Sequence, residues 1–246
     1  RPIFTLDPAF HAGAYYVQEA SSMFVWQALE SIGHSHKALN ILDLSAAPGG
    51  KSTLIANWLN GDGMLCANDP IKNRAYTLKY NLMKEGYSNI VVTHNDPKDF
   101  GQLENFFDII LVDAPCSGEG MFRKDPDTIK EWSEDNVNHC SARQKRILAD
   151  VLPALKVGGH LIYSTCTFNE SENIDNVAWM CQEYDLKCAA IQTKPSWNID
   201  FEQKGTATGY QFYPNKVQGE GFFISMLQKT DLTQSRKNLK QNNQTI

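Results

Sequence analysis

The sequence lacks several patterns that would point directly to a function. No stretch of its 246 residues is apolar for long enough to span a membrane. Its formal net charge is −5, which argues against indiscriminate binding of nucleic acid but still allows a local basic groove. Its six cysteines form no Cys-x-x-Cys pair and no cluster with histidine, so we expect no metal site. They suit free thiols in a reducing compartment, and we expect a cytoplasmic protein.

Two nucleotide-binding motifs are also missing, although one segment comes close to both. Asp43–Lys51 (DLSAAPGGK) continues into Ser52, but Ser45 stands where a P-loop requires its first glycine, and G-x-G-x-x-G does not fit either. What remains is a glycine-rich turn between a predicted strand and a predicted helix, where a ligand can approach the backbone and the helix N-terminus. The alternative is a turn chosen for its geometry alone. The predicted cofactor-binding residues here are Ala46, Ala47, Pro48, Gly49, Gly50 and Lys51.

Apolar β-prone runs alternate with helical segments from residue 39 onward. Five such strands with helices between them, followed by two strands with no clear helix between them, predict an α/β fold. We expect a mostly parallel, doubly wound, seven-stranded sheet with an antiparallel edge pair. Asn169 and Glu172 resemble a capping box that begins a helix ending near Tyr184. The expected parts are a lead-in segment and helix (1–36), a catalytic domain (37–229) and a polar tail (230–246).

Acidic residues follow the second and third predicted strands. Asp69 comes about 19 residues after Gly50, where a carboxylate can accept hydrogen bonds from both ribose hydroxyls of an adenosine cofactor. Asp96 is placed to meet an adenine amino group, although a helix or turn cap explains it almost as well. Both are predicted cofactor-binding residues.

Two cysteines follow strands that are expected to end at the same edge of the sheet: Cys116 in Asp113-Ala-Pro-Cys116 and Cys166 in Tyr-Ser-Thr-Cys166. A thiolate that adds to C6 of cytosine makes C5 nucleophilic enough to accept a methyl group. A carboxyl group near N3 can stabilise the ring, and Asp113 could serve. A lone cysteine is more often a small buried apolar residue, but two at matched strand ends favour chemistry. Packing is the role expected for the remaining cysteines, Cys66, Cys140, Cys181 and Cys188.

Basic residues near the first cysteine offer a contact for phosphates. Arg123 and Lys124 follow the Cys116 loop directly, and both are predicted to contact RNA, although charged residues are often only solvated. Arg143, Lys145 and Arg146 are weaker candidates for the same role.

The longest motifs resemble the Sun/NSUN family of RNA 5-methylcytosine methyltransferases, in particular its bacterial RsmF-type branch that modifies small-subunit (16S) ribosomal RNA. The matching segments cover nearly the whole chain: YYVQEASSM, LDLSAAPGGK, DAPCSGEGMFRKDP, YSTCTFNESEN and the terminal GEGFF. The resemblance implies a Rossmann-like methyltransferase with S-adenosylmethionine as cofactor and ribosomal RNA or the small subunit as partner. We expect a monomer.

The resemblance also implies roles for single residues. Cys166 would be the nucleophile, and Cys116 would help to release the methylated RNA. Lys51 and Asp113 would lie at the target base, and the cofactor region would include Asp69, Arg74, Asp96 and Asp113. The family usually has cysteine at Ser45, a small change that should be tolerated. Its members also carry an RNA-binding segment ahead of the first motif, so we expect this chain to be a fragment.

Two other functions remain open at the level of the sequence. In a DNA cytosine-5 methyltransferase the Pro-Cys thiol is the nucleophile and no second thiol is needed, so the presence of Cys166 favours RNA. The second alternative is a protein without catalytic activity that binds the cofactor and acts as a scaffold in ribosome assembly. It is disfavoured because Cys116, Cys166 and Asp113 are all present.

Overall fold

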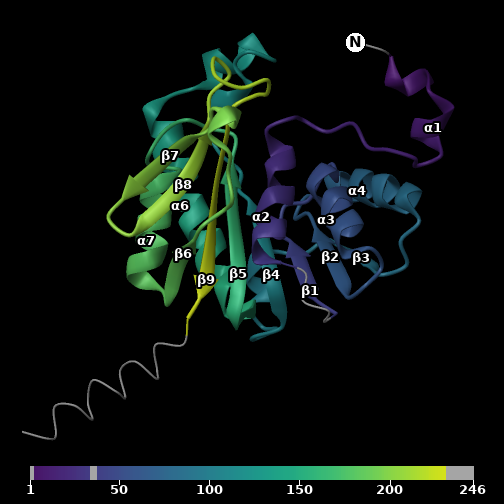
Figure 1. Ribbon diagram of the computed structural model, residues 1–246, viewed down its shortest axis with the longest axis horizontal. Coiled ribbons are helices and arrows are strands. Elements are labelled where there is room, and N and C mark those ends of the chain that lie inside the picture. Colours follow the sequence, from purple (N-terminus) through teal and green to yellow (C-terminus); the bar gives the residue numbers. More distant parts are fainter. Residues whose placement is uncertain (1–2, 34–37, 231–246) are drawn as a thin grey trace, which may run out of the picture.

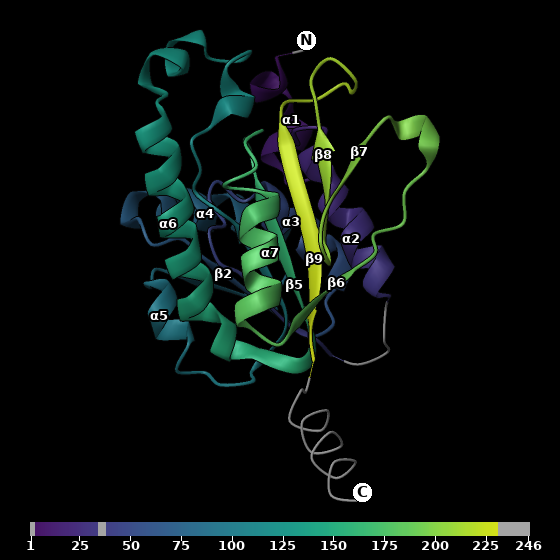
Figure 2. The ribbon, with the colours of Figure 1, turned by 90° about the vertical axis from the view of Figure 1, so that its left-hand side faces the viewer.

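A computed structural model describes residues 3–33 and 38–230 of the chain. These residues form one mixed sheet flanked by helices on both faces (Figures 1 and 2). The strands are β1 (Asn40–Asp43), β2 (Met64–Asn68), β3 (Ile90–Thr93), β4 (Phe107–Asp113), β5 (Leu155–Thr165), β6 (Leu186–Ala189), β7 (Asp200–Lys204), β8 (Ala207–Phe212) and β9 (Phe222–Lys229). The helices are α1 (Pro8–His11), α2 (Val25–Ile32), α3 (Gly50–Leu59), α4 (Lys72–Glu85), α5 (Pro97–Phe100), α6 (Glu134–Val151) and α7 (Ile174–Glu183).

The strand order is β3-β2-β1-β4-β5-β9-β8-β7, and β6 pairs with β9 beside this path. The first five strands are parallel to one another, whereas β9 runs antiparallel to β5, β6 and β8. Because β1, β4 and β5 are adjacent and parallel, the loops that follow them meet at one edge of the sheet. The sequence-derived α/β fold class is confirmed.

The two faces of the sheet bury separate apolar clusters because side chains alternate along each strand. One face packs Ile41, Leu65 and Ile109 against α2, α3 and α4, with Trp58 fully buried among them. The other face packs Leu42, Ile110 and Tyr163 against α5, α6 and α7. Buried strands of this kind are continuously apolar, which explains why the sequence located β1, β2, β4 and β5 well.

The sequence predicts seven strands, and this number is wrong, because the described residues contain nine. The hairpin of β7 and β8 was missed. Its outer strand, β7, reads Asp-Phe-Glu-Gln-Lys and carries several exposed polar residues, so it lacks the apolar run that reveals a buried strand.

The prediction that a helix begins at Asn169 is also wrong. Asn169 and Glu172 do contact each other, but α7 begins at Ile174, and its N-cap residue, Asn173, makes no side-chain capping bond. The contact between Asn169 and Glu172 instead closes a turn beside the second cysteine loop.

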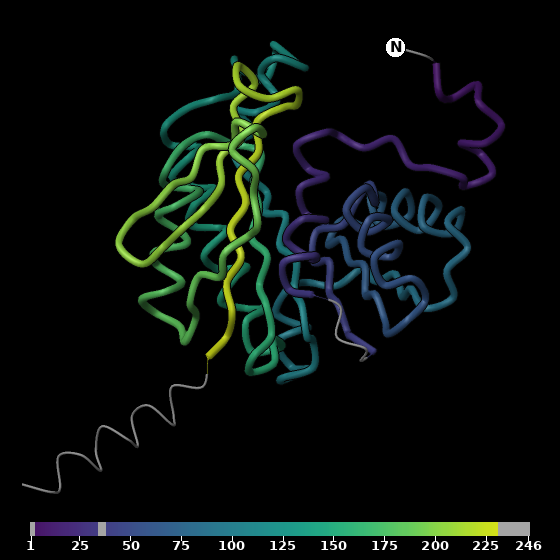
Figure 3. Tube along the Cα trace, in the orientation of Figure 1, coloured from purple at the N-terminus to yellow at the C-terminus, as the bar shows by residue number. Residues whose placement is uncertain are grey.

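The N-terminal segment takes a separate path before it joins the sheet. Figure 3 shows it in purple, passing over α4 and then turning down into α2. The Lys84 ammonium lies 4.4 Å from the centre of the Phe10 ring, which attaches this segment to α4.

Six short 3-10 helices complete the described chain: η1 (Phe4–Leu6), η2 (Ser22–Phe24), η3 (Glu119–Met121), η4 (Pro126–Glu131), η5 (Leu152–Ala154) and η6 (Pro195–Trp197). The polar tail predicted from residue 230 lies almost entirely outside the described residues, and the domain boundaries stay predictions.

Candidate active site

Two cysteine thiols meet at the edge of the sheet where β4 and β5 end. The Sγ atoms of Cys116 and Cys166 lie 3.1 Å apart, and the backbone N–H of Cys166 points to the Cys116 sulfur at 3.4 Å. Cys116 lies three residues beyond β4, and Cys166 follows β5 directly. The pairing of Asp113 with Ser164 in the parallel register sets the two loops side by side. The sequence placed both thiols on one edge, and the structure brings them into contact.

Lys51 and Asp113 form an ion pair next to these thiols. The Lys51 Nζ lies 2.8 Å from Asp113 Oδ2, and the Ser164 hydroxyl donates to Asp113 Oδ1 at 2.7 Å. The Lys51 ammonium also lies 5.6 Å from the centre of the Phe222 ring. Burial opposes the charge on Lys51, but Asp113 outweighs it and raises the pKa of Lys51. The site therefore holds a fixed positive charge and a carboxylate with both oxygens occupied.

The thiols differ in acidity. The hydrogen bond between the sulfurs lowers the pKa of Cys166 against burial, while the Asp113 charge raises it and the Lys51 charge partly offsets Asp113. The same hydrogen bond, together with burial, raises the pKa of Cys116 well above its ordinary value. Cys166 is therefore the thiol that more readily forms the nucleophilic thiolate.

Two buried carboxylates lock the cysteine loops together, and the sequence analysis did not identify either as part of the site. Glu119 accepts hydrogen bonds from the Thr167 hydroxyl and the Phe168 N–H, each at 2.7 Å, and from the Trp132 indole at 2.8 Å. Glu172 accepts the Ser117 N–H at 3.1 Å and the Gln144 amide at 2.6 Å. Each carboxylate thus joins the Cys116 loop to the segment after Cys166. No sequence pattern marks either carboxylate, because both lie in polar stretches and their burial appears only in the folded structure.

Close backbone packing at Gly120 belongs to the same arrangement. A Cβ atom there would lie 2.7 Å from the carbonyl oxygen of Cys166 and equally close to that of Gly221. The Gly120 N–H donates to the same Cys166 oxygen at 2.8 Å. Only glycine allows the loop after Cys116 to reach Cys166 in this way.

The glycine-rich turn after β1 is held from outside by three side chains. Arg74 donates to the Ala47 carbonyl at 3.0 Å, Asn81 donates to the Pro48 carbonyl at 2.8 Å, and Gln18 donates to the Gly50 carbonyl. Gly49 has a φ of 118°, a left-handed conformation that requires glycine. Ala46, Ala47, Pro48, Gly49 and Gly50 thus form a rigid cradle at the N-terminus of α3. Gln18 and Asn81 were not assigned to the turn from the sequence.

Buried acceptors without hydrogen-bond partners flank this cradle. Asp69 is completely buried after β2, and its Oδ2 has no hydrogen-bond donor, although Arg74 lies 3.2 Å away as an ion-pair partner. Asp43, the last residue of β1, accepts a hydrogen bond from Ser52 at 2.6 Å, while its Oδ1 has no partner. Burial raises the pKa of Asp43 to about 7. Buried oxygens of this kind normally have donors, so they fit a ligand that brings hydroxyl or ammonium groups.

Asp96 has a local structural role. Its carboxylate accepts the Lys98 N–H at 3.1 Å in a capping box with Asp99, at the start of the short helix α5. Asp96 therefore caps a helix, which is the alternative role that the sequence suggested for it. A cofactor contact for Asp96 stays a prediction.

The basic residues after Cys116 are exposed. Arg123 donates to the Gly219 carbonyl at 2.6 Å and pairs with Glu220 at 3.2 Å, so part of its charge is already compensated. Lys124 is exposed next to it. Neither is joined to the thiol pair by a hydrogen bond, and their RNA contacts stay predictions.

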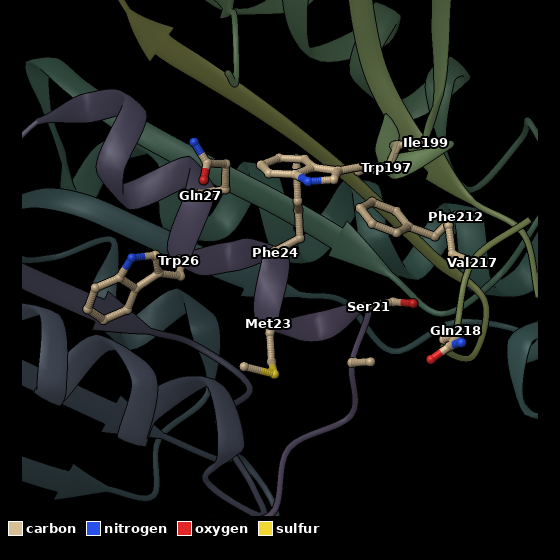
Figure 4. A pocket seen from close by; sticks show the side chains of 11 residues that line it. Ser21, Met23, Phe24, Trp26, Gln27, Trp197, Ile199, Phe212, Val217 and Gln218 are labelled. Carbon is tan, nitrogen blue, oxygen red and sulfur yellow. The ribbon is translucent and has the colours of Figure 1, made fainter. Parts of the chain in front are cut away.

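A separate apolar groove of about 400 Å³ has Phe212 in its lining (Figure 4). Its walls come from η2, α2, η6 and the β8–β9 region, and include Met23, Phe24, Trp26 and Trp197. Its lining contains no thiol and no titratable side chain, so the groove does not contribute to the chemistry of the thiol pair.

No group of three or more His, Cys, Asp or Glu side chains converges to hold a metal ion within residues 3–33 and 38–230. In the same part of the chain, no helix is long and apolar enough to cross a membrane.

The strand order and the glycine-rich turn after β1 are those of a Rossmann-like methyltransferase, and solved structures agree. NSun6 from Pyrococcus horikoshii, solved with SFG, is 30% identical, with a TM-score of 0.81 over 94% of this chain and 57% of that one. A methyltransferase homologue from the same organism is also 30% identical, with a TM-score of 0.77 over 93% of this chain and 72% of its own.

Residues 32–228 match the family model of the 16S rRNA methyltransferases RsmB/F, and the chain belongs to this family. It is 39% identical over 221 residues to the ribosomal RNA small subunit methyltransferase F of Pectobacterium atrosepticum. That match covers 89% of this chain but 45% of the relative, so the chain spans about half the length of the curated relative. The family resemblance inferred from the motifs is confirmed.

Proposed function

We propose that the protein methylates C5 of a cytosine in small-subunit ribosomal RNA, through a covalent bond between Cys166 and C6 of the base. The observation that carries this proposal is the contact of two thiols, 3.1 Å apart, beside the Lys51–Asp113 ion pair. A methyltransferase that acts on an amino group or a hydroxyl has no need of a thiol pair. Family membership supports ribosomal RNA as the substrate class.

Each residue of the site has a chemical task in this proposal. The Cys166 thiolate adds to C6, which turns C5 into a nucleophile. Asp113, held by Lys51 and Ser164, is the carboxyl group that supplies the hydrogen bond or proton at N3 as the thiolate adds to C6. After methylation, Cys116 in its thiolate form accepts the proton from C5, the C5–H electron pair forms the C5–C6 double bond, and the bond from C6 to Cys166 breaks to release Cys166 as a thiolate. Lys51 contributes a positive charge that partly offsets the effect of the Asp113 carboxylate on the Cys166 thiol.

S-adenosylmethionine supplies the electrophilic methyl group. The turn Ala46–Gly50 and the buried Oδ2 of Asp69, which accepts no hydrogen bond, are the groups that hold it in this proposal, and Arg74 supports both through Ala47 and Asp69. Asp43 is a further acceptor at the same edge of the sheet, and the sequence analysis did not select it.

The alternative, a DNA cytosine-5 methyltransferase, would use Cys116 as the nucleophile. The lowered pKa of Cys166 and the raised pKa of Cys116 favour the opposite assignment. Family membership favours RNA over DNA.

The deciding experiment uses S-adenosylmethionine with a labelled methyl group and matched RNA and DNA hairpins. We expect label in the RNA only, and nucleoside mass spectrometry should identify it as 5-methylcytidine. A Cys116→Ser/Cys166→Ser double variant is the control and should transfer no label. Label on a ribose oxygen or an exocyclic nitrogen, or preferential labelling of DNA, would contradict the proposal.

A further inference from the structure

A second pair of thiols lies away from the active site. The Sγ atoms of Cys181 and Cys188 are 3.9 Å apart, the first in the last turn of α7 and the second in the middle of β6. The sequence analysis assigned both to packing. The structure leaves both half-buried, whereas Cys66 and Cys140 are buried. Both pack against the apolar cluster under α6 and α7, as expected, and they also form a second close pair of thiols.

The surroundings make the two thiols unequal. The Thr208 N–H donates to the Cys188 sulfur at 3.3 Å. The hydrogen bonds from Cys181 and from Thr208 lower the pKa of Cys188 to about 6, although burial opposes them. The same pairing raises the pKa of Cys181 far above its ordinary value. Cys188 is therefore the more acidic of the two thiols, although its Sγ also lies 3.8 Å from the Thr208 carbonyl oxygen, to which its thiol form can donate.

Cys181 and Cys188 both line a cavity of about 360 Å³. Tyr184, Lys187 and Thr206 also line it, so a small polar molecule can reach the pair, and the lysine supplies positive charge. A reactive thiolate with a second thiol in reach and an accessible approach is the arrangement that thiol–disulfide exchange requires.

We propose that Cys188 and Cys181 form a dithiol site that reacts with low-molecular-weight disulfides of the glutathione type. This inference does not depend on the proposed methyltransferase chemistry.

The exchange proceeds in two balanced steps. The Cys188 thiolate attacks one sulfur of glutathione disulfide, forms a mixed disulfide and releases one glutathione thiolate. That thiolate accepts the Cys181 proton, and Cys181 then attacks the Cys188 sulfur and releases the second glutathione as a thiolate. Two electrons from the protein thiols reduce one disulfide, and a bond forms between Cys181 and Cys188.

Little movement is needed to close that bond. The two sulfurs lie 3.9 Å apart, and a disulfide requires them to approach to about 2.05 Å. Cys181 lies in the final turn of its helix, two residues before α7 ends, where helix ends commonly fray. The last turn can therefore shift without moving the body of α7.

The test treats a Cys116→Ser/Cys166→Ser background with glutathione disulfide, so that the active-site pair cannot react. We expect a protein lighter by two hydrogen atoms, with one cross-linked peptide that joins Cys181 to Cys188. Adding Cys181→Ser should stop the reaction at a single glutathione adduct on Cys188, and adding Cys188→Ser should prevent both products. Cys140→Ser is the matched control and should behave as its parent. Absence of the Cys188 adduct in the Cys181→Ser protein would overturn the proposal.

A second measurement needs no substitution. Brief alkylation of the unmodified protein by iodoacetamide, followed by peptide mass spectrometry, compares the two half-buried thiols directly. We expect Cys188 to react at least about tenfold faster than Cys181, because the thiolate is the nucleophile. Equal rates, or a faster Cys181, would overturn the proposal even if a variant fails to fold.

Discussion

The Lys51 ammonium and the Asp113 carboxylate lie 2.8 Å apart, although 62 positions separate them in the sequence. Lys51 is the second residue of α3, and Asp113 is the last residue of β4. Their contact depends on β1 and β4 being parallel neighbours, because α3 begins just after β1. The ion pair beside Cys166 is therefore set in place by the sheet itself.

Replacing Cys166 by alanine should abolish methyl transfer, because it removes the proposed nucleophile. The affinity for S-adenosylmethionine should stay within about twofold of the parent, since Cys166 lies outside the glycine-rich cradle. Methyl transfer to RNA and calorimetric titration of the cofactor measure the two effects separately. Substantial remaining turnover would show that another group attacks the base.

Replacing Cys116 by alanine should leave the first bond-forming step intact and slow the release of product. A covalent adduct of protein and RNA should then accumulate and appear as a slow band on a denaturing gel. A Cys116→Ala/Cys166→Ala double variant should show no such band. If Cys166→Ala traps the adduct instead, the roles of the two thiols are reversed.

Asp69→Ala should weaken the binding of S-adenosylmethionine, because it removes the proposed acceptor for the ribose hydroxyls. A hydrogen bond to a charged group contributes roughly 1.5–3 kcal/mol, which corresponds to about a ten- to hundredfold loss of affinity. Asp62→Ala, at an exposed aspartate near the opposite end of β2, is the matched control and should bind normally. Unchanged affinity in the Asp69 variant would move the ribose site elsewhere.

Asp43 should make the stability of the protein depend on pH. Burial raises the pKa of Asp43 from 3.8 to about 7, so the folded protein holds this proton more tightly than the unfolded chain does. The stabilising contribution is fully present below about pH 4 and is lost as the pH rises through 7. Each unit of pKa shift corresponds to about 1.4 kcal/mol, so the loss should total roughly 4 kcal/mol.

The measurement for Asp43 is urea unfolding of the parent and of Asp43→Asn from pH 4 to pH 8. The asparagine keeps an acceptor for Ser52 but carries no ionisable proton. The free energy of unfolding of the parent, relative to the variant, should fall across this range. A constant difference would contradict the raised pKa, and Asp62→Asn should show a constant difference as the exposed control.

Glu119→Gln should lower the free energy of unfolding by roughly 1.5–3 kcal/mol, because an amide turns a donor toward the donors that now face a carboxylate. Methyl transfer should fall as well, since Glu119 joins the loops that carry the two thiols. Urea unfolding and initial rates measure the two effects. Glu131→Gln, at an exposed position in η4, should change neither, and equal behaviour of the two variants would remove the proposed role of Glu119.

The sequence predicted much of the site because its motifs stand at strand ends. Cys116, Cys166, Asp113 and Lys51 were all selected, and the structure groups them around one ion pair and one thiol pair. The sequence did not reveal Glu119 or Glu172. Carboxylates that accept hydrogen bonds from distant parts of the chain follow no regular spacing of residues in the sequence. Asp43 was passed over for a similar reason, since only its burial and its unpartnered oxygen distinguish it.

The sequence by itself determined the alternation of strands and helices, the glycine-rich turn and the position of each thiol after a strand. These features depend on local hydrophobic runs and on the backbone freedom of glycine, which neighbouring residues set. Only the tertiary structure decided that β5 lies beside β4 and that β6 lies along β9. Strand order follows from packing and hydrogen bonding between distant segments. The contacts between Cys116 and Cys166, between Lys51 and Asp113, and between Cys181 and Cys188 therefore appear only once the sheet has formed.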